Sequence, residues 1–92
     1  TKIEASRLLT WRSAADSDAG LQNTESAAHA KRFAADTAME VSTDAVQVYG
    51  GYGYSEEYPV ARLMRAAKVM QIYEGSSQVQ RMIIGREITK DL

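Results

Sequence analysis

The sequence predicts an all-α fold, an up-and-down bundle of about four helices. Apolar residues recur at intervals of three and four, and no segment alternates between apolar and polar residues as a half-buried strand would. The 92 residues include only one Pro and six Gly, so few positions interrupt a helix. A chain of this length forms at most one small domain.

The first helix is expected over residues 2–19. Its apolar residues spread over more than half of the circumference, which leaves only a narrow polar strip. So broad an apolar surface calls for more than one neighbour. No capping signal precedes the helix, and we therefore expect it to be the remainder of a longer helix in a larger subunit.

The second helix is expected over residues 25–49, because Gly20 ends the first helix and Thr24 is suited to the N-cap. Its pattern is the most regular in the chain, and the many alanines predict close packing against other helices. The apolar face consists of Ala27, Ala30, Ala34, Ala38, Val41, Ala45 and Val48. The opposite, polar face consists of His29, Asp36, Glu40, Asp44 and Gln47.

Two shorter helices are expected in the second half of the chain. Residues 50–54, GGYGY, end the second helix, and Pro59 suits the first turn of a third over residues 59–68. A joint over residues 69–75 leads to a fourth helix over residues 77–90, where Ser77 and Gln80 match a capping box. The side chains expected to be buried in these helices are Val60, Leu63, Met64, Ala67, Val79, Met82, Ile83 and Ile88.

Composition excludes several classes of function. The 11 basic residues are scattered among 12 acidic ones, so there is no basic patch for nucleic acid, and no apolar run approaches the ~18 residues of a membrane span. Without Cys, and with one His, the chain has no disulfide, no Cys-ligated zinc and no plausible Ser-His triad. The lack of Cys fits a reducing compartment. We expect the bacterial cytoplasm, or the mitochondrial matrix if the source is eukaryotic.

Two joints are candidates for chemistry. The glycines of residues 50–54 expose backbone N–H groups that suit phosphate, but their spacing matches neither the dinucleotide fingerprint nor the Walker loop, which favours a helix stop and a turn. At the second joint, Glu74 precedes Gly75 and a helix N-terminus, whose dipole favours the charged carboxylate. An apolar ligand covering Glu74 would make it a stronger base. The alternative is an ordinary surface glutamate, which the pattern alone favours.

Basic and aromatic residues near the joints leave two interpretations open. Arg62, Arg65 and Lys68 lie on one expected helix, and Arg81 and Arg86 on the next. They suit phosphate contacts, although solvated faces and internal ion pairs are commoner. The tyrosines cluster about the joints, where they would line a flavin or nucleotide or pack against one another.

Residues 44–87, DAVQVYGGYGYSEEYPVARLMRAAKVMQIYEGSSQVQRMIIGRE, resemble the C-terminal helical domain of the FAD-dependent acyl-CoA dehydrogenases. Three motifs carry the resemblance in the family's order: Q-x-x-G-G-x-G-Y, Y-P-x-x-R-x-x-R-A-A-K and I-Y-E-G-S-x-x-V-Q-R. It continues back through AKRFAADTA and IEASRLLTWRSA, so that it covers nearly the whole chain.

The resemblance implies roles in catalysis and substrate binding. Glu74 matches the base that removes the α-proton of an acyl-CoA thioester while the β-hydrogen leaves as hydride to the flavin. Gly75 matches the residue whose backbone lies beside the substrate, and Arg86 matches a position near the CoA nucleotide. Ala66 stands where the family often has Asp, a departure that removes no assigned role.

The resemblance also implies two contributions to FAD binding. Ser76 and Gln78 match residues that contact the flavin cofactor, with Ser76 standing where the family usually has Thr. Gln47, Gly50 and Gly51 match the loop that holds the adenosine-diphosphate part of the FAD of a neighbouring subunit. The cofactor is expected in the full-length enzyme and not in this chain alone.

The leading interpretation is therefore part of an acyl-CoA dehydrogenase that makes a trans-2-enoyl-CoA, inactive as an isolated chain. The implied partners are the acyl-CoA substrate, an electron-transfer flavoprotein and further copies of the subunit in a dimer of dimers. The alternatives are a non-enzymatic helical interaction module and an acyl-CoA oxidase-like relative. Glu74 at this joint argues against isovaleryl-type members but does not fix the acyl chain length.

Overall fold

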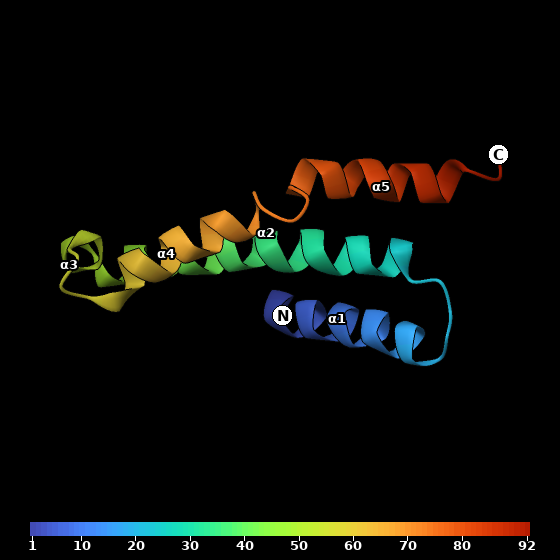
Figure 1. Ribbon diagram of the computed structural model, residues 1–92. Helices are drawn as coiled ribbons and strands as arrows, with labels where there is room; N and C mark the ends of the chain where they lie inside the picture. Colours follow the sequence, from blue (N-terminus) through green and yellow to red (C-terminus); the bar gives the residue numbers. More distant parts are fainter.

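Five helices and no strand make up the computed structural model, which describes residues 1–92 (Figure 1). The four expected helices are present, with ends within two residues of the predicted ones, so the all-α prediction is confirmed. A single helical turn between the second and third was not predicted. The helices are α1 (Lys2–Asp18), α2 (Thr24–Tyr49), α3 (Gly51–Tyr54), α4 (Pro59–Met70) and α5 (Ser77–Thr89).

Two predicted N-caps were wrong by one residue. Asn23, not Thr24, is the N-cap of α2, and Ser76, not Ser77, is the N-cap of α5. The Ser76 hydroxyl accepts a hydrogen bond from the Val79 backbone N–H at 3.3 Å. Ser77 cannot do this, because it lies inside the helix and its hydroxyl donates to a side chain of α2. As predicted, Pro59 stands at the first turn of α4.

The glycine-rich segment after α2 is more than a turn, because residues 51–54 wind into one turn of helix. Gly50 has a φ of 65° and its carbonyl accepts from the Gly53 N–H at 2.9 Å. Gly53 is buried against the end of α2: a Cβ there would lie 2.5 Å from the Val46 carbonyl oxygen and 2.7 Å from the Tyr49 Cβ. Close approach of the two backbones therefore requires a glycine at this position.

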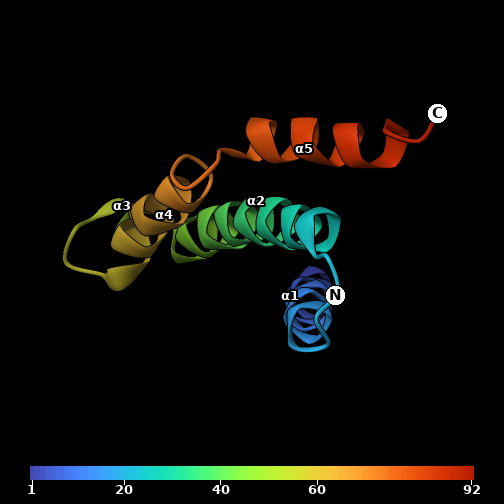
Figure 2. The ribbon, with the colours of Figure 1, turned by 45° about the vertical axis from the view of Figure 1, so that its right-hand side comes forward.

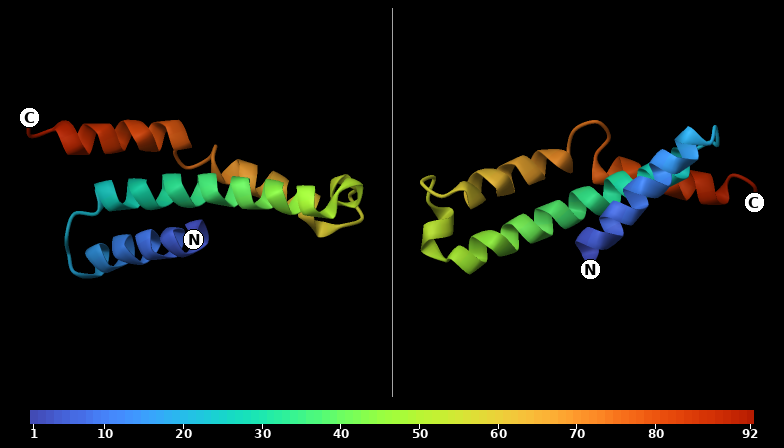
Figure 3. Two further views of the ribbon diagram at one scale, coloured as in Figure 1. Left: turned by 180° about the vertical axis from the view of Figure 1, so that it is seen from behind. Right: turned by 90° about the horizontal axis from the view of Figure 1, so that it is seen from below.

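Helix α2 is the centre of the arrangement, and α1, α4 and α5 each pack against it and not against one another. Figures 2 and 3 show α1 and α5 on opposite sides of α2, while α4 lies along its C-terminal half. Helices α4 and α5 therefore follow one another along α2, and the connection between them lies near its middle. The molecule is elongated, with extents of 51 × 23 × 20 Å.

The core is small and consists mostly of alanines. The buried apolar residues are Ala28, Ala30, Ala35, Val60 and Ala67. Three of them belong to α2, and Ala28 and Ala35 lie off its predicted apolar face because α2 has neighbours on several sides. Burial of Val60 and Ala67 on α4 was predicted correctly, but Leu63 is 53% exposed.

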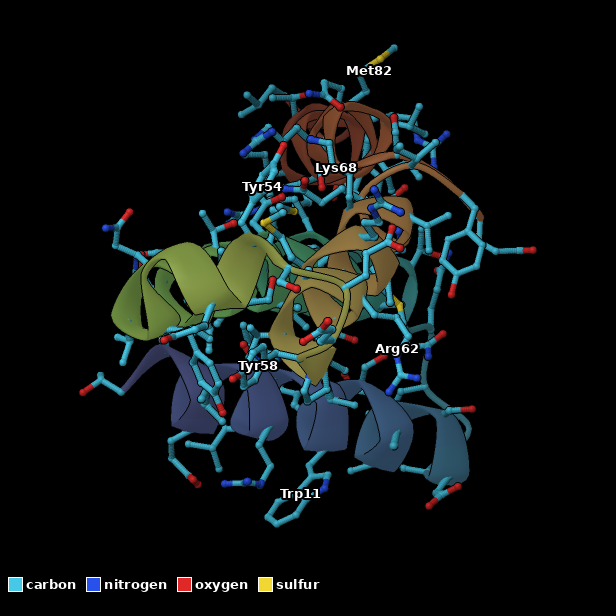
Figure 4. The ribbon with its side chains drawn as sticks, turned by 90° about the vertical axis from the view of Figure 1, so that its left-hand side faces the viewer. Trp11, Tyr54, Tyr58, Arg62, Lys68 and Met82 are labelled. Carbon is cyan, nitrogen blue, oxygen red and sulfur yellow. The ribbon has the colours of Figure 1, made fainter.

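The prediction of which side chains of α5 are buried was also wrong. Val79, Met82 and Ile88 are all exposed, and the Met82 side chain points away from the other helices (Figure 4). Helix α5 instead rests on α2 through Ser77 and Gln80, which are buried.

On α1, the broad apolar surface meets only α2. Trp11 is 62% exposed and points outward, and Ile3 and Leu8 are exposed as well (Figure 4). The predicted need for more than one neighbour is thus not met within this chain. None of the helices combines the length and the apolar character required to cross a bilayer.

Candidate active site

The connection between α4 and α5, residues 71–76, holds its central glutamate in an unusual backbone conformation. Glu74 has a φ of 55°, the only positive φ at a non-glycine residue, and Gly75 follows with a φ of 93°. A left-handed conformation costs a residue with a side chain about 1–2 kcal/mol, which the surroundings must offset. The Glu74 side chain is exposed and takes part in none of the chain's ion pairs or side-chain hydrogen bonds. Its carboxylate is therefore available to a ligand.

Lys31 of α2 holds the α4–α5 connection through its backbone. The Lys31 Nζ donates to the carbonyl oxygens of Tyr73 and Gly75, at 3.1 Å each, and to that of Met70 at the end of α4. These bonds use all three N–H groups of the ammonium. Gln80 Nε2 donates to the Gly75 carbonyl as well, at 3.1 Å. Glu74 thus stands between two carbonyls fixed by the same cation.

Asp36, five residues further along α2, ties the two ends of the connection together. Its Oδ1 accepts from Gln71 Nε2 and from the Ser77 hydroxyl, at 2.8 Å each, and its Oδ2 accepts from Arg81 Nη2 at 3.1 Å. Partial burial acts to raise the pKa of Asp36, but hydrogen bonds from Ser77 and Gln71 and the charges of Arg81 and Arg32 outweigh it and lower the pKa. Asp36 is therefore a carboxylate at neutral pH.

Two features favour a glycine at position 75. Its φ of 93° lies in the region that favours glycine, and a Cβ would lie 2.4 Å from the Gln80 Nε2 that bonds its carbonyl. The space that a side chain at position 75 would need is therefore already occupied by the Gln80 amide.

A cavity of about 370 Å³ adjoins the connection at the N-terminal end of α5. Ser76 and Gln78 line it together with Lys68, Arg81 and the Asp36 carboxylate, so hydroxyl, amide and cationic donors face one space in which Asp36 already pairs with Arg81. This donor set fits the anionic and polar parts of a nucleotide cofactor such as FAD. The structure thus brings Ser76 and Gln78 together next to Glu74.

The other predicted cofactor residues lie elsewhere. Gln47 is exposed on the last turn of α2, and Gly50 and Gly51 follow it at the end of the molecule occupied by α3, away from the α4–α5 connection (Figure 1). A Cβ at either glycine would meet no atom within 4 Å, so this backbone is open to a partner. Arg86, on the last turns of α5, is exposed and bonds Glu87 at 3.2 and 3.3 Å.

The tyrosines near α3 pack mainly against one another. The ring of Tyr58 lies 6.0 Å from that of Tyr49 and 5.6 Å from that of Tyr52. Of the basic residues on α4, Arg65 lies 3.8 Å from Glu56. Both observations agree with the packing and ion-pair interpretations of these residues.

Lys31, Asp36 and Gln80 were not recognised as parts of the site from the sequence. A signal was present for the first: Lys31 interrupts the most alanine-rich segment and has Ala27 and Ala35 at the positions where a helical ion-pair partner would stand. A charge on a helix packed on several sides needs a partner from another helix. For Lys31 that partner is the backbone around Glu74.

Comparison with known proteins adds to this geometry. Residues 1–89 match the family described as acyl-CoA dehydrogenase, C-terminal domain. The chain is 55% identical over 91 residues to a cyclohexane-1-carbonyl-CoA dehydrogenase of Geobacter metallireducens, a match that covers 99% of this chain and 24% of that protein. The solved structure of butyryl-CoA dehydrogenase from Megasphaera elsdenii is similar with a TM-score of 0.92 and 55% identity, over 95% of this chain and 23% of that one.

A further similar chain comes from a structure described as the electron transferring flavoprotein of Acidaminococcus fermentans, in work on flavin-based electron bifurcation. Its TM-score is 0.96 at 53% identity, and the match covers 99% of this chain and 24% of that one. The chain therefore spans about a quarter of the length of the relatives it matches. Fold and sequence agree along its whole length, and the chain belongs to the acyl-CoA dehydrogenase family, of which it matches the C-terminal domain.

Proposed function

We propose that this chain is the C-terminal helical part of a longer flavin-dependent acyl-CoA dehydrogenase, in which Glu74 is the catalytic base. The observation that carries the proposal is a glutamate with no partner, held at a φ of 55° beside Gly75 on a connection that α2 fixes from both ends. A base must be free to accept a proton and fixed in place to reach it.

The proposed reaction forms a double bond between Cα and Cβ of an acyl-CoA thioester. The α-proton moves to the Glu74 carboxylate, and the electron pair of the broken Cα–H bond becomes the second bond between Cα and Cβ. Bound FAD would supply the acceptor for the β-hydrogen, which leaves Cβ with its electron pair as hydride, and the product would be a trans-2-enoyl-CoA. Gly75 has no side chain of its own, so its backbone is proposed to lie directly beside the thioester.

The remaining site residues are proposed to contact three different groups: the FAD of the same subunit, the FAD of a neighbouring subunit, and the CoA substrate. Ser76 and Gln78, supported by the donor set of their cavity, are proposed to contact the flavin cofactor of the same subunit. Gln47, Gly50 and Gly51 lie at the other end of the molecule, which supports a role toward the FAD of a neighbouring subunit (Figure 1). Arg86 is proposed to lie near the CoA nucleotide, where a phosphate would compete with Glu87 for its guanidinium.

The partners follow from the same proposal. An electron-transfer flavoprotein would be the electron acceptor of the reduced flavin, a proposal that the similarity to a chain from the Acidaminococcus fermentans structure supports. The subunit assembles as a dimer of dimers. The similar proteins named above come from bacteria, in agreement with the proposed cytoplasmic location.

Glu74→Gln in the longer protein that contains this chain tests the proposal. Gln keeps the shape but cannot take up the proton, so flavin reduction by acyl-CoA should slow by about 10²–10⁴-fold or more while acyl-CoA still binds. The measurement is anaerobic stopped-flow bleaching of the flavin. The matched control is Glu57→Gln, an exposed glutamate in the connection between α3 and α4, which should leave the rate unchanged.

Bleaching of Glu74→Gln at the wild-type rate would refute the assignment of the base. A reduced flavin that reacts readily with oxygen during turnover would instead indicate the oxidase-like alternative.

A further inference from the structure

We propose that Lys31 is a positioning residue for Glu74: its ammonium fixes the peptide groups on both sides of the base and thereby sets where the carboxylate stands. This inference rests on the proposed function, because it assigns Lys31 a part in the reaction of Glu74.

The three bonds of Lys31 are placed so that they act on the conformation of Glu74. The Tyr73 carbonyl, 3.1 Å from Lys31 Nζ, belongs to the peptide group from which the φ of Glu74 is measured. The Gly75 carbonyl, also at 3.1 Å, belongs to the peptide group that follows the second left-handed residue. With Met70 as the third acceptor, the end of α4 is held by the same atom. The cation therefore constrains the backbone before and after Glu74 together.

Lys31 also differs from the other lysines in the chain. Lys2 and Lys90 each pair with a glutamate, and Lys68 bonds Gln71. Lys31 has no carboxylate partner, and its charge is offset by carbonyl dipoles that include the negative end of α4. Its side chain is half-buried and lies 5.8 Å from the centre of the Tyr73 ring. All the hydrogen bonds of Lys31 therefore go to the backbone of residues 70–75, the segment that carries Glu74.

Removal of Lys31 should leave the chain folded but Glu74 misplaced. Asp36 would still hold Gln71 and Ser77, so the ends of the connection would stay together. The strained φ of Glu74 would lose its support, and the backbone would relax towards a common conformation. A displacement of about 1 Å at a reacting group is enough to cost up to about 10²-fold in rate.

The test uses Lys31→Met in the flavin-loaded, full-length enzyme, since Met retains the length and packing of the side chain without its donors. Flavin reduction at saturating acyl-CoA should slow by about 10- to 100-fold. The dissociation constant for acyl-CoA should change by less than about threefold, because Lys31 faces the backbone and not the ligand. Lys2→Met, which removes a lysine from an exposed ion pair with Glu40, is the matched control and should leave the rate unchanged.

A double variant separates positioning from a general structural effect. If Lys31 acts through Glu74, then Lys31→Met combined with Glu74→Gln should be no slower than Glu74→Gln alone, within about twofold. Multiplied losses would overturn the inference, and so would a wild-type rate in Lys31→Met. Should Lys31→Met fail to fold, Lys31→Gln, which keeps neutral donors at shorter reach, takes its place with the same criteria.

The two proposals fail in different ways. A wild-type rate in Glu74→Gln would remove the proposed function itself. A large loss in Glu74→Gln together with an unchanged rate in Lys31→Met would leave the function intact and remove only the role of Lys31.

Discussion

The isolated 92-residue chain is expected to associate with itself, and its surface area gives the reason. The chain exposes 6554 Å², whereas a monomeric protein of 10.1 kDa exposes about 5,300 Å². The excess of about 1,250 Å² is larger than the ~800 Å² that each partner buries in a standard interface. The radius of gyration, 15.6 Å, also exceeds the ~12 Å of a compact chain of this length.

The contact is expected at the groove between α1, α2 and α4. This cavity of about 420 Å³ is lined mostly by apolar side chains, among them Ile3, Val41 and Leu63 from the three helices. Leu63 is 53% exposed, so Leu63→Glu can be accommodated in the monomer. In a complex the same carboxylate would be buried without a partner. We expect a loss of about 2 kcal/mol or more, which weakens association about 30-fold.

Sedimentation velocity over a range of concentrations measures this effect. Met82→Glu introduces the same charge on the outer surface of α5, away from the groove, and should change association by less than about threefold (Figure 4). A wild-type chain that stays strictly monomeric at high concentration would refute the argument from area. If the two substitutions weakened association equally, the contact would not lie at the groove between α1, α2 and α4.

Three further predictions concern other features of the chain. Gly53→Ala should destabilise the chain by about 1–3 kcal/mol, because the added Cβ would lie 2.5 Å from the Val46 carbonyl oxygen. Gly51→Ala is the control and should leave stability unchanged, because its Cβ would meet no atom within 4 Å. Urea unfolding followed by circular dichroism compares the two variants, and equal unfolding midpoints would contradict the packing of α3. The pKa of Asp36 is lowered below its ordinary value of 3.8, so its contribution to stability is fully present above that pH and is lost as the pH falls through the folded value. Asp36→Asn should therefore lower stability near neutral pH and flatten its decline in acid, and unfolding midpoints that follow the same pH profile in both proteins would contradict this. The isolated chain should bind no stoichiometric FAD, since it carries only part of a flavin site, and a yellow protein after purification would show the opposite.

The helix ends were predictable from the sequence because their signals are local. Gly20 and Gly50 allow a left-handed backbone after a helix, and Pro59 fits a first helical turn, whatever the rest of the chain does. Burial was harder to predict. Periodicity says which side chains share a face but not which face meets a neighbour, and α5 uses the face with Ser77 and Gln80 while Met82 faces outward.

The candidate site was predictable only in part for a similar reason. Glu74 was singled out by its position before a helix N-terminus, and the roles proposed for Glu74, Gly75 and Ser76 come from a resemblance to known proteins, because the three lie together in one short motif. Lys31 and Asp36 come from a different helix, and Asp36 was assigned to a polar face on the basis of its spacing alone. Only the packing of α5 and the end of α4 onto α2 brings these charges to their partners.

The bonds of Asp36 have a consequence for the order in which the chain folds. They reach Gln71, Ser77 and Arg81 across 35, 41 and 45 residues of sequence. Helices form locally within about a microsecond, whereas contacts across such separations must wait for the chain to close a long loop. During synthesis α2 leaves the ribosome before Gln71, Ser77 and Arg81 do, and the last of these bonds cannot form until Arg81 has emerged. The backbone around Glu74 is therefore among the last parts of the molecule to take its final shape.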